Sequence, residues 1–161
     1  LVFVNKDGKP TKIPENIYMN VFFSLFIVIM IVFQYLGLLI SNLDYIFAYS
    51  GSIMCILFIF VNNNKIIDLL HFLYCFVYLY AIALLSDNKY LLLLNIGMLA
   101  NIMFSRYYYK SCILGNKQKH KGYFYDVNKN LKSLIPQWNW DYVFFLAIIV
   151  SLINFLKLKT I

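Results

Sequence analysis

The sequence predicts an all-α integral membrane protein, a bundle of five transmembrane helices. Of its 161 residues, 62% are hydrophobic and only 13% are charged, and the mean hydropathy is +0.71. Soluble domains average roughly 45–50% apolar and about 25% charged residues. The apolar residues also fall into five long segments, each close to the roughly 20 residues that cross the hydrocarbon core of a bilayer. These observations argue against most soluble enzymes, DNA-binding domains and disordered chains.

Residues 1–15 form a short polar N-terminal segment, and residues 16–161 form the multi-span membrane domain. The first segment reads LVFVNKDGKPTKIPE. It predicts a strand at Leu1 to Val4, a turn at Asp7-Gly8 and a helix start at Pro14-Glu15.

The predicted membrane-spanning helices follow in chain order. They cover about residues 17–40, 43–61, 66–85, 90–105 and 142–158. Only Ser41 and Asn42 separate the first two helices, so these are predicted to run antiparallel. The fourth is the shortest, and the tyrosines at 107–109 can extend it at the interface. Trp138 and Trp140 introduce the fifth, as expected for aromatic residues at headgroup depth.

Lys and Arg are distributed unevenly between the two ends of these helices. Eleven of the 14 fall on the side that holds the N-terminus, Lys65 and the 106–141 loop, and three fall on the other side. Short cytoplasmic loops are enriched in Lys and Arg. We therefore predict that the N-terminus and the loop lie on the cytoplasmic, or matrix-equivalent, side and the C-terminus on the opposite side.

The basic 106–141 loop is the only long hydrophilic connection between the predicted spans. Its lysines stand beside aromatic residues, which suits anionic lipid headgroups, at about 1 kcal/mol per basic residue near such a surface. The candidate headgroup contacts are Lys117, Lys119, Lys121, Lys129 and Lys132. The same charges also fit ordinary cytoplasmic enrichment without lipid specificity. A single Arg on a membrane-tethered loop offers little capacity to read bases, so no nucleic-acid partner is predicted.

Asp68 and His71 are the candidate functional residues inside a predicted span. They lie three positions apart and so share one helix face. Ionisable residues within a membrane are costly, and such a pair can relay protons or contribute two metal ligands. Alternatively, Asp68 lies about one turn after Lys65 and forms only an interfacial polar pair. Two ligands do not complete a metal site, so no metal or cofactor is predicted.

No catalytic residue is predicted within the chain, because it carries none of the common nucleotide-binding, zinc-protease or serine-hydrolase motifs. The remaining polar residues in the spans are expected to form interhelical hydrogen bonds, at roughly 0.6–2 kcal/mol each. They are Asn20, Gln34, Asn95, Asn101 and Asn154. Three glycines, Gly37, Gly51 and Gly97, are expected to allow close helix approach. Of the cysteines, Cys55 and Cys75 are predicted to pack as small apolar residues, and Cys112 is a candidate for palmitoylation.

The N-terminal segment is similar to the pattern FVxVDxxGKPxPIPE. The residues that carry the similarity are Phe3 and Asp7, at open positions of the pattern, and Val4, Gly8, Lys9, Pro10, Ile13, Pro14 and Glu15, at its fixed positions. The segment thereby resembles the C-terminal end of hotdog-fold acyl-CoA thioesterases, although Asn5 replaces the usual Asp and Lys12 the usual Pro. The resemblance covers less than a tenth of the chain. It implies a thioesterase domain upstream of Leu1, which fits the absence of a starting Met, and it places the family's catalytic and coenzyme A contacts in that domain.

Three functions remain open from the sequence. The first is a non-catalytic anchor or scaffold that tethers an acyl-CoA thioesterase to a membrane. The second is an accessory subunit of a larger membrane complex, such as an organellar one, with other membrane subunits or a second copy as partners beside the lipids. Ile, Asn, Lys, Phe and Tyr, all read from A/T-rich codons, make up 78 of the 161 residues, which indicates an A/T-biased genome. The third is a small transporter or membrane-embedded enzyme that uses Asp68 and His71.

Overall fold

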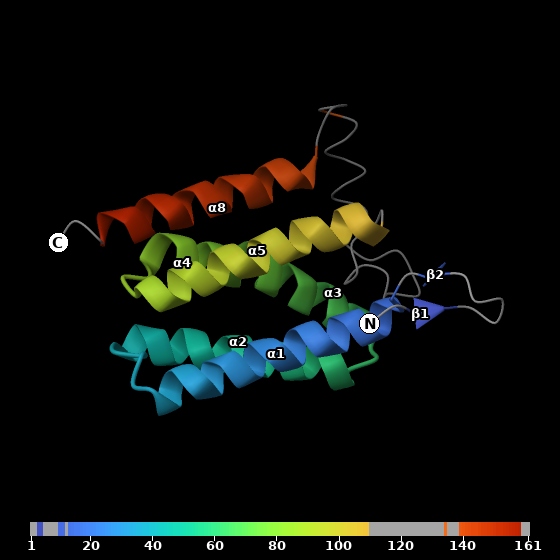
Figure 1. Cartoon of the computed structure of the whole chain (residues 1–161), viewed down its shortest axis with the longest axis horizontal. Helices are drawn as coiled ribbons and strands as arrows, with labels where there is room; N and C mark the ends of the chain where they lie inside the picture. Colours follow the sequence, from blue (N-terminus) through green and yellow to red (C-terminus); the bar gives the residue numbers. More distant parts are fainter. Residues whose placement is uncertain (1–2, 5–9, 12, 110–133, 135–138, 159–161) are drawn as a thin grey trace.

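Five long helical segments form an antiparallel bundle, with a small β-hairpin before the first (Figure 1). The computed structural model describes residues 3–4, 10–11, 13–109, 134 and 139–158. Consecutive segments run in opposite directions. The N-terminal end of the first and the C-terminal end of the last therefore lie at opposite ends of the bundle.

The hairpin consists of β1 (Phe3–Val4) and β2 (Pro10–Thr11), which pair antiparallel with Phe3 opposite Thr11. β1 lies where the sequence predicted a strand. The first helix, α1 (Glu15–Tyr35), begins directly after Pro14, which is also where a helix start was predicted.

The first helix ends earlier than predicted, at Tyr35 rather than Ile40. Gly37 adopts a left-handed conformation with φ 65°. Its N–H donates to Gln34 O at 3.1 Å, and the N–H of Leu38 donates to Phe33 O at 2.9 Å. This is the Schellman arrangement that terminates helices at a glycine. The apolar run continues to Ile40, but the backbone turns at Gly37, and hydropathy does not register that turn.

The second helix, α2 (Asn42–Phe60), begins with a capping box. The hydroxyl of Ser41 accepts from the N–H of Asp44 at 3.1 Å, and Asp44 Oδ2 accepts from the N–H of Ser41 at 3.1 Å. The reciprocal pair satisfies two backbone donors at the helix start. α2 runs antiparallel to α1, as predicted, although the two are joined by residues 36–41 rather than by two residues.

The third segment comprises α3 (Asn64–Phe72), a π-helical turn η1 (Leu73–Tyr78) and α4 (Leu79–Leu85). Asn63 caps its start, because the side-chain Oδ1 accepts from the N–H groups of Lys65 and Ile66. Before and within η1 the segment packs against α2, and after it α4 packs against α5 and α8. The third segment is the most enclosed of the three candidate spans.

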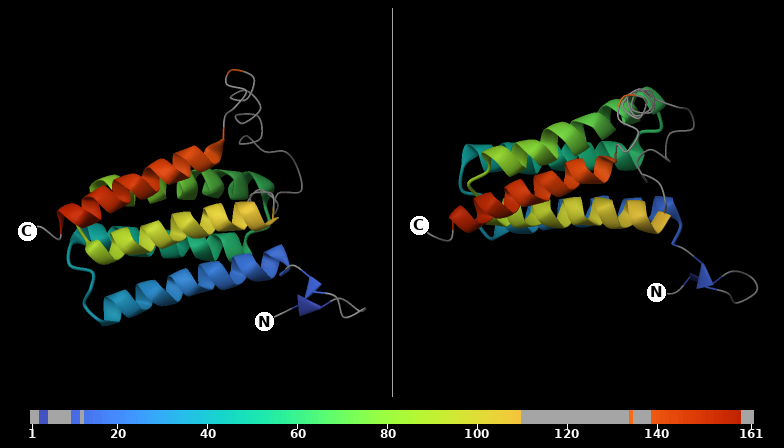
Figure 2. Two further views of the ribbon diagram at one scale, coloured as in Figure 1. Left: turned by 45° about the horizontal axis from the view of Figure 1, so that its top comes forward. Right: turned by 90° about the horizontal axis from the view of Figure 1, so that it is seen from above.

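The last two helices are α5 (Lys89–Tyr109) and α8 (Trp140–Lys157), which pack closely on one another. α5 includes the tyrosines that were expected to extend it. Both Figure 1 and the left view of Figure 2 show α5 between α8 and α1. The bundle therefore consists of an α1–α2 hairpin beside a group formed by α4, α5 and α8, with α3 and η1 in contact with the hairpin.

Three helical segments of the described chain are long and apolar enough to cross a membrane: Glu15–Tyr35, Asn42–Phe60 and Asn64–Leu85. α5 and α8 are not among them. In α5 the polar side chains of Asn95 and Asn101 lower the apolar content of the helix. The helical bundle is thus as predicted, with three candidate spans, and the fourth and fifth spans stay predictions.

Candidate functional site

The third segment holds the two residues singled out by the sequence. Asp68 is half-buried and His71 is buried, both on α3 near the end of the bundle that carries the start of α1. Within the described residues, no three His, Cys, Asp or Glu side chains gather to form a metal-ligand group. A functional role for Asp68 and His71 therefore stays a prediction.

The π-helical turn lies in the middle of the same segment and buries Tyr74, Cys75 and Tyr78. Such turns are rare and occur frequently at functional sites. The ring of Tyr74 lies edge-on to both Phe23 and Phe58, at centroid distances of 5.9 and 5.8 Å. Around Tyr74 the interior is filled with aromatic rings from α1, α2 and η1.

Tyr78 of η1 packs closely against Gly51 of α2. The hydroxyl of Tyr78 donates to Phe47 O at 2.9 Å, so the polar end of this buried ring is satisfied. A Cβ at Gly51 would clash with that hydroxyl and would lie 2.9 Å from the ring of Phe26. Gly51 therefore provides the close approach predicted for it. Gly97 has open space around it, and Gly37 serves the turn after α1, so neither provides such a contact.

A polar cluster lies around Asp44 and Asn88, at the end of the bundle opposite to Asp68 and His71. Asp44 is only 3% exposed. Its Oδ2 accepts from Asn88 Nδ2 at 2.8 Å, and the same nitrogen donates to Leu38 O at 2.7 Å. The side-chain oxygen of Asn88 accepts from the N–H groups of Tyr90 and Leu91, which caps α5. This cluster was not predicted, although the spacing Ser41-x-x-Asp44 before an apolar run indicates a capping box.

Three of the five predicted interhelical hydrogen-bonding residues are confirmed. Asn95 Nδ2 donates to Leu79 O and to Ser151 Oγ, both at 3.0 Å, and Asn154 Nδ2 donates to Ala83 O at 2.7 Å. Asn101 Oδ1 accepts from the hydroxyl of Tyr18.

The prediction is wrong for Asn20 and Gln34, which make no interhelical hydrogen bond within the described part of the chain. Both are exposed on α1. They lie on the face of the helix that points away from the bundle, so no neighbouring helix is in reach.

Tyrosine hydroxyls supply interhelical contacts that the sequence did not predict. Tyr80 donates to Val143 O, and Tyr109 donates to Ile13 O at 2.8 Å. With Tyr18 and Tyr78, four tyrosines link different pairs of segments. The chain contains 14 tyrosines, and nothing in their spacing distinguishes those that bridge helices from those that face outward.

One ion pair joins α5 to α8 across the ends of the predicted basic loop. Arg106 Nε lies 2.7 Å from Asp141 Oδ1, and the guanidinium lies 6.0 Å from the centre of the Phe144 ring. The predicted headgroup lysines (Lys117, Lys119, Lys121, Lys129 and Lys132) lie outside the described residues, as does Cys112. Cys55 and Cys75 are buried, as predicted.

No known family, curated protein or solved structure matches this chain.

Proposed function

We propose that this chain is a five-span membrane domain that serves as an anchor or scaffold. The observation that carries the proposal is the outer surface of the bundle. Each of the five helical segments exposes large apolar side chains, among them Val21, Ile46, Leu69, Leu93 and Leu146. Soluble monomers rarely expose apolar patches larger than a few hundred Å². Exposing such a surface to water is unfavourable, whereas in a bilayer it contacts hydrocarbon. The exposed apolar side chains therefore support membrane insertion of α5 and α8 as well as of the three candidate spans.

The proposed orientation follows from the charge distribution. α1 and α3 begin, and α5 ends, at the same end of the bundle (Figure 1), and most of the Lys and Arg residues adjoin these helix ends in the sequence. By the positive-inside rule, this end faces the cytoplasm or the matrix. The C-terminal end of α8 then lies on the opposite side of the membrane.

Cysteine labelling tests both insertion and orientation. In a Cys112→Ser background, Asn62→Cys and Asp87→Cys place thiols in the connections at opposite ends of the bundle, where both residues are exposed. A membrane-impermeant maleimide added to sealed vesicles should label the two variants from opposite sides, with the Asn62→Cys thiol on the cytoplasmic side. Labelling of both from the same side, or of buried Cys55 in intact vesicles, would contradict the proposed topology.

For the anchored partner, we propose an acyl-CoA thioesterase, because residues 1–15 resemble the end of that family. The hairpin of β1 and β2 leads directly into α1, so a domain joined here would be held at the membrane surface. The intact mass of the native protein tests this. The native protein is expected to be heavier than 19.0 kDa by the mass of a domain, which is roughly 100 residues or more. A mass near 19.0 kDa would refute the tethering and leave the membrane domain itself untouched.

The exposed polar pair Asn20 and Ser24 favours the alternative function of an accessory subunit. The two residues lie four positions apart on the outer face of α1, next to the exposed apolar side chains of Val21, Leu25 and Val28. In a bilayer, such residues hydrogen-bond across helices, so they support a contact with another membrane subunit or a second copy. Stoichiometric co-purification in mild detergent that is lost in Asn20→Leu/Ser24→Ala would support this alternative. A monomer in both proteins would exclude it.

A further inference from the structure

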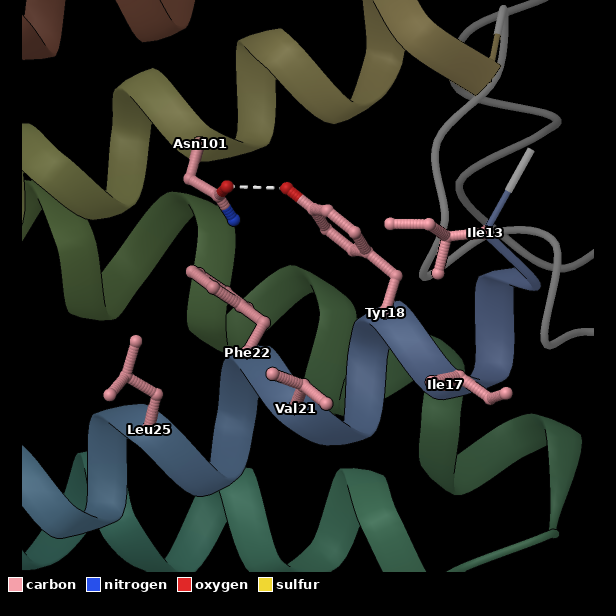
Figure 3. Close-up of a pocket in the computed structure, with 7 residues that line it drawn as sticks. All are labelled: Ile13, Ile17, Tyr18, Val21, Phe22, Leu25 and Asn101. Carbon is pink, nitrogen blue, oxygen red and sulfur yellow. Dashed lines mark hydrogen bonds between the residues drawn. The ribbon is translucent and has the colours of Figure 1, made fainter. Parts of the chain in front are cut away.

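An outward-facing groove lies between α1 and α5, and its walls are almost entirely apolar (Figure 3). Its volume is about 320 Å³, within the range of roughly 300–1,000 Å³ typical of small-molecule sites. One wall consists of Ile13, Ile17, Tyr18, Val21, Phe22 and Leu25. Asn101 of α5 contributes to the other side.

The groove exists because α1 and α5 approach one another only at separate points. Tyr18 lies edge-on to Tyr109 at 5.6 Å, and its hydroxyl donates to Asn101. Near the other end of the helices, Phe33 lies edge-on to Tyr90 at 6.0 Å. α1 otherwise packs on α2 and α5 on α8. Three groove side chains, Ile17, Val21 and Leu25, remain exposed toward the surroundings of the bundle.

The length of the groove corresponds to one leaflet of a bilayer. Ile17 and Leu25 are eight residues apart, which is about 12 Å along a helix. Leu25 is the middle residue of α1, whose bounds are Glu15–Tyr35. The groove thus runs from the end of the helix to its centre, and the hydrocarbon of one leaflet is about 15 Å deep.

In the sequence, a basic residue adjoins each of two described residues at the mouth of the groove, which favours an anionic headgroup. In the sequence, Lys12 directly precedes Ile13 and Lys110 directly follows Tyr109. Ile13 and Tyr109 are themselves joined, because the tyrosine hydroxyl donates to Ile13 O. The anionic lipids of a cytoplasmic leaflet attract basic residues at that surface by about 1 kcal/mol each.

We propose that the α1–α5 groove binds one acyl chain of an anionic phospholipid from the leaflet on the basic side. The chain lies against Val21 and Leu25, and the headgroup lies at the mouth beside Ile13. The inference rests on the proposed membrane insertion and goes beyond it, since it assigns a lipid site to a defined part of the surface.

Crosslinking with a photoactivatable lipid tests the site. The whole chain is reconstituted in vesicles with phosphatidylglycerol that carries a diazirine in the middle of one acyl chain. Val21→Trp fills the groove. Val28→Trp is the matched control, because Val28 is comparably exposed on the same helix but lies outside the groove. Crosslinks to α1 and α5 should fall several-fold in Val21→Trp and remain unchanged in Val28→Trp. Ile17→Trp serves as a second filling variant if Val21→Trp does not fold.

The possible outcomes separate this proposal from that of membrane insertion. Crosslinks spread evenly along the exposed side of α1, and equal in both variants, would overturn the groove site and leave insertion intact. An absence of crosslinks to α1 in every variant would overturn insertion as well. A phosphatidylcholine probe should crosslink several-fold less than the phosphatidylglycerol probe, and equal yields would overturn the assignment to an anionic lipid.

Discussion

Gly51 and Gly97 offer a matched test of close packing, since both lie within helices and only one is crowded. Ala at position 51 would force Tyr78 or Phe26 to move and would disturb the hydrogen bond from Tyr78 to Phe47 O. Overpacking of this kind costs about 1–3 kcal/mol. Gly97→Ala meets nothing within 4 Å and should stabilise α5 by up to about 1 kcal/mol. Thermal unfolding of both variants in one detergent measures the difference, and equal midpoints would refute the packing argument.

The residues whose environments were predicted correctly differ in kind from those that were missed. Asn95 and Asn154 could be predicted because an amide within an apolar run requires a partner, whatever that partner is. Asp44 and Asn88 lie at helix ends, where a polar residue is ordinarily solvated, so their burial depends on the meeting of two connections 44 positions apart. For Asn20 and Gln34 the predicted partners are missing, because composition does not reveal which face of a helix turns outward.

At the scale of the element, the π-helical turn predicts an unusual tolerance to deletion. A π turn contains one residue more than the corresponding α-helical turn, so loss of the exposed Val77 should restore an α-helix and keep both flanks in register. Loss of Val28, which is similarly exposed in α1, instead rotates the rest of that helix by about 100°. The variant lacking Val77 should retain a cooperative unfolding transition and the variant lacking Val28 should not. Circular dichroism during thermal unfolding measures both variants, and the reverse result would contradict this account of η1.

Helix positions were predictable from hydropathy, whereas their ends and internal geometry were not. The five helical segments occur where the apolar runs predicted them. The stop of α1 depends on the conformation of Gly37, and η1 depends on which carbonyl each N–H reaches. Neither is encoded in apolar content. The start of α1 was predictable because Pro14 fixes a local backbone angle.

For the whole molecule, Asn88 is expected to hold the two parts of the bundle together at one end. It connects the start of α5 to Asp44 of α2 and to Leu38 of the α1–α2 connection. Asn88→Ala removes the cap of α5 and leaves buried polar groups without their donor, which should cost about 2–3 kcal/mol. The exposed Asn62→Ala should stay within about 0.5 kcal/mol. Unfolding in a denaturing detergent compares the two, and equal stability would show that Asn88 is dispensable.

The four bridging tyrosines have a consequence for how this bundle can be dissected. Phe has the same ring as Tyr, so each Tyr→Phe change removes a single oxygen and opens no cavity. The bonds concerned lie between α1 and α5, η1 and α2, α4 and α8, and α5 and the segment before α1. The contribution of each hydrogen bond to helix association can therefore be measured separately, while the shape of the interior is preserved.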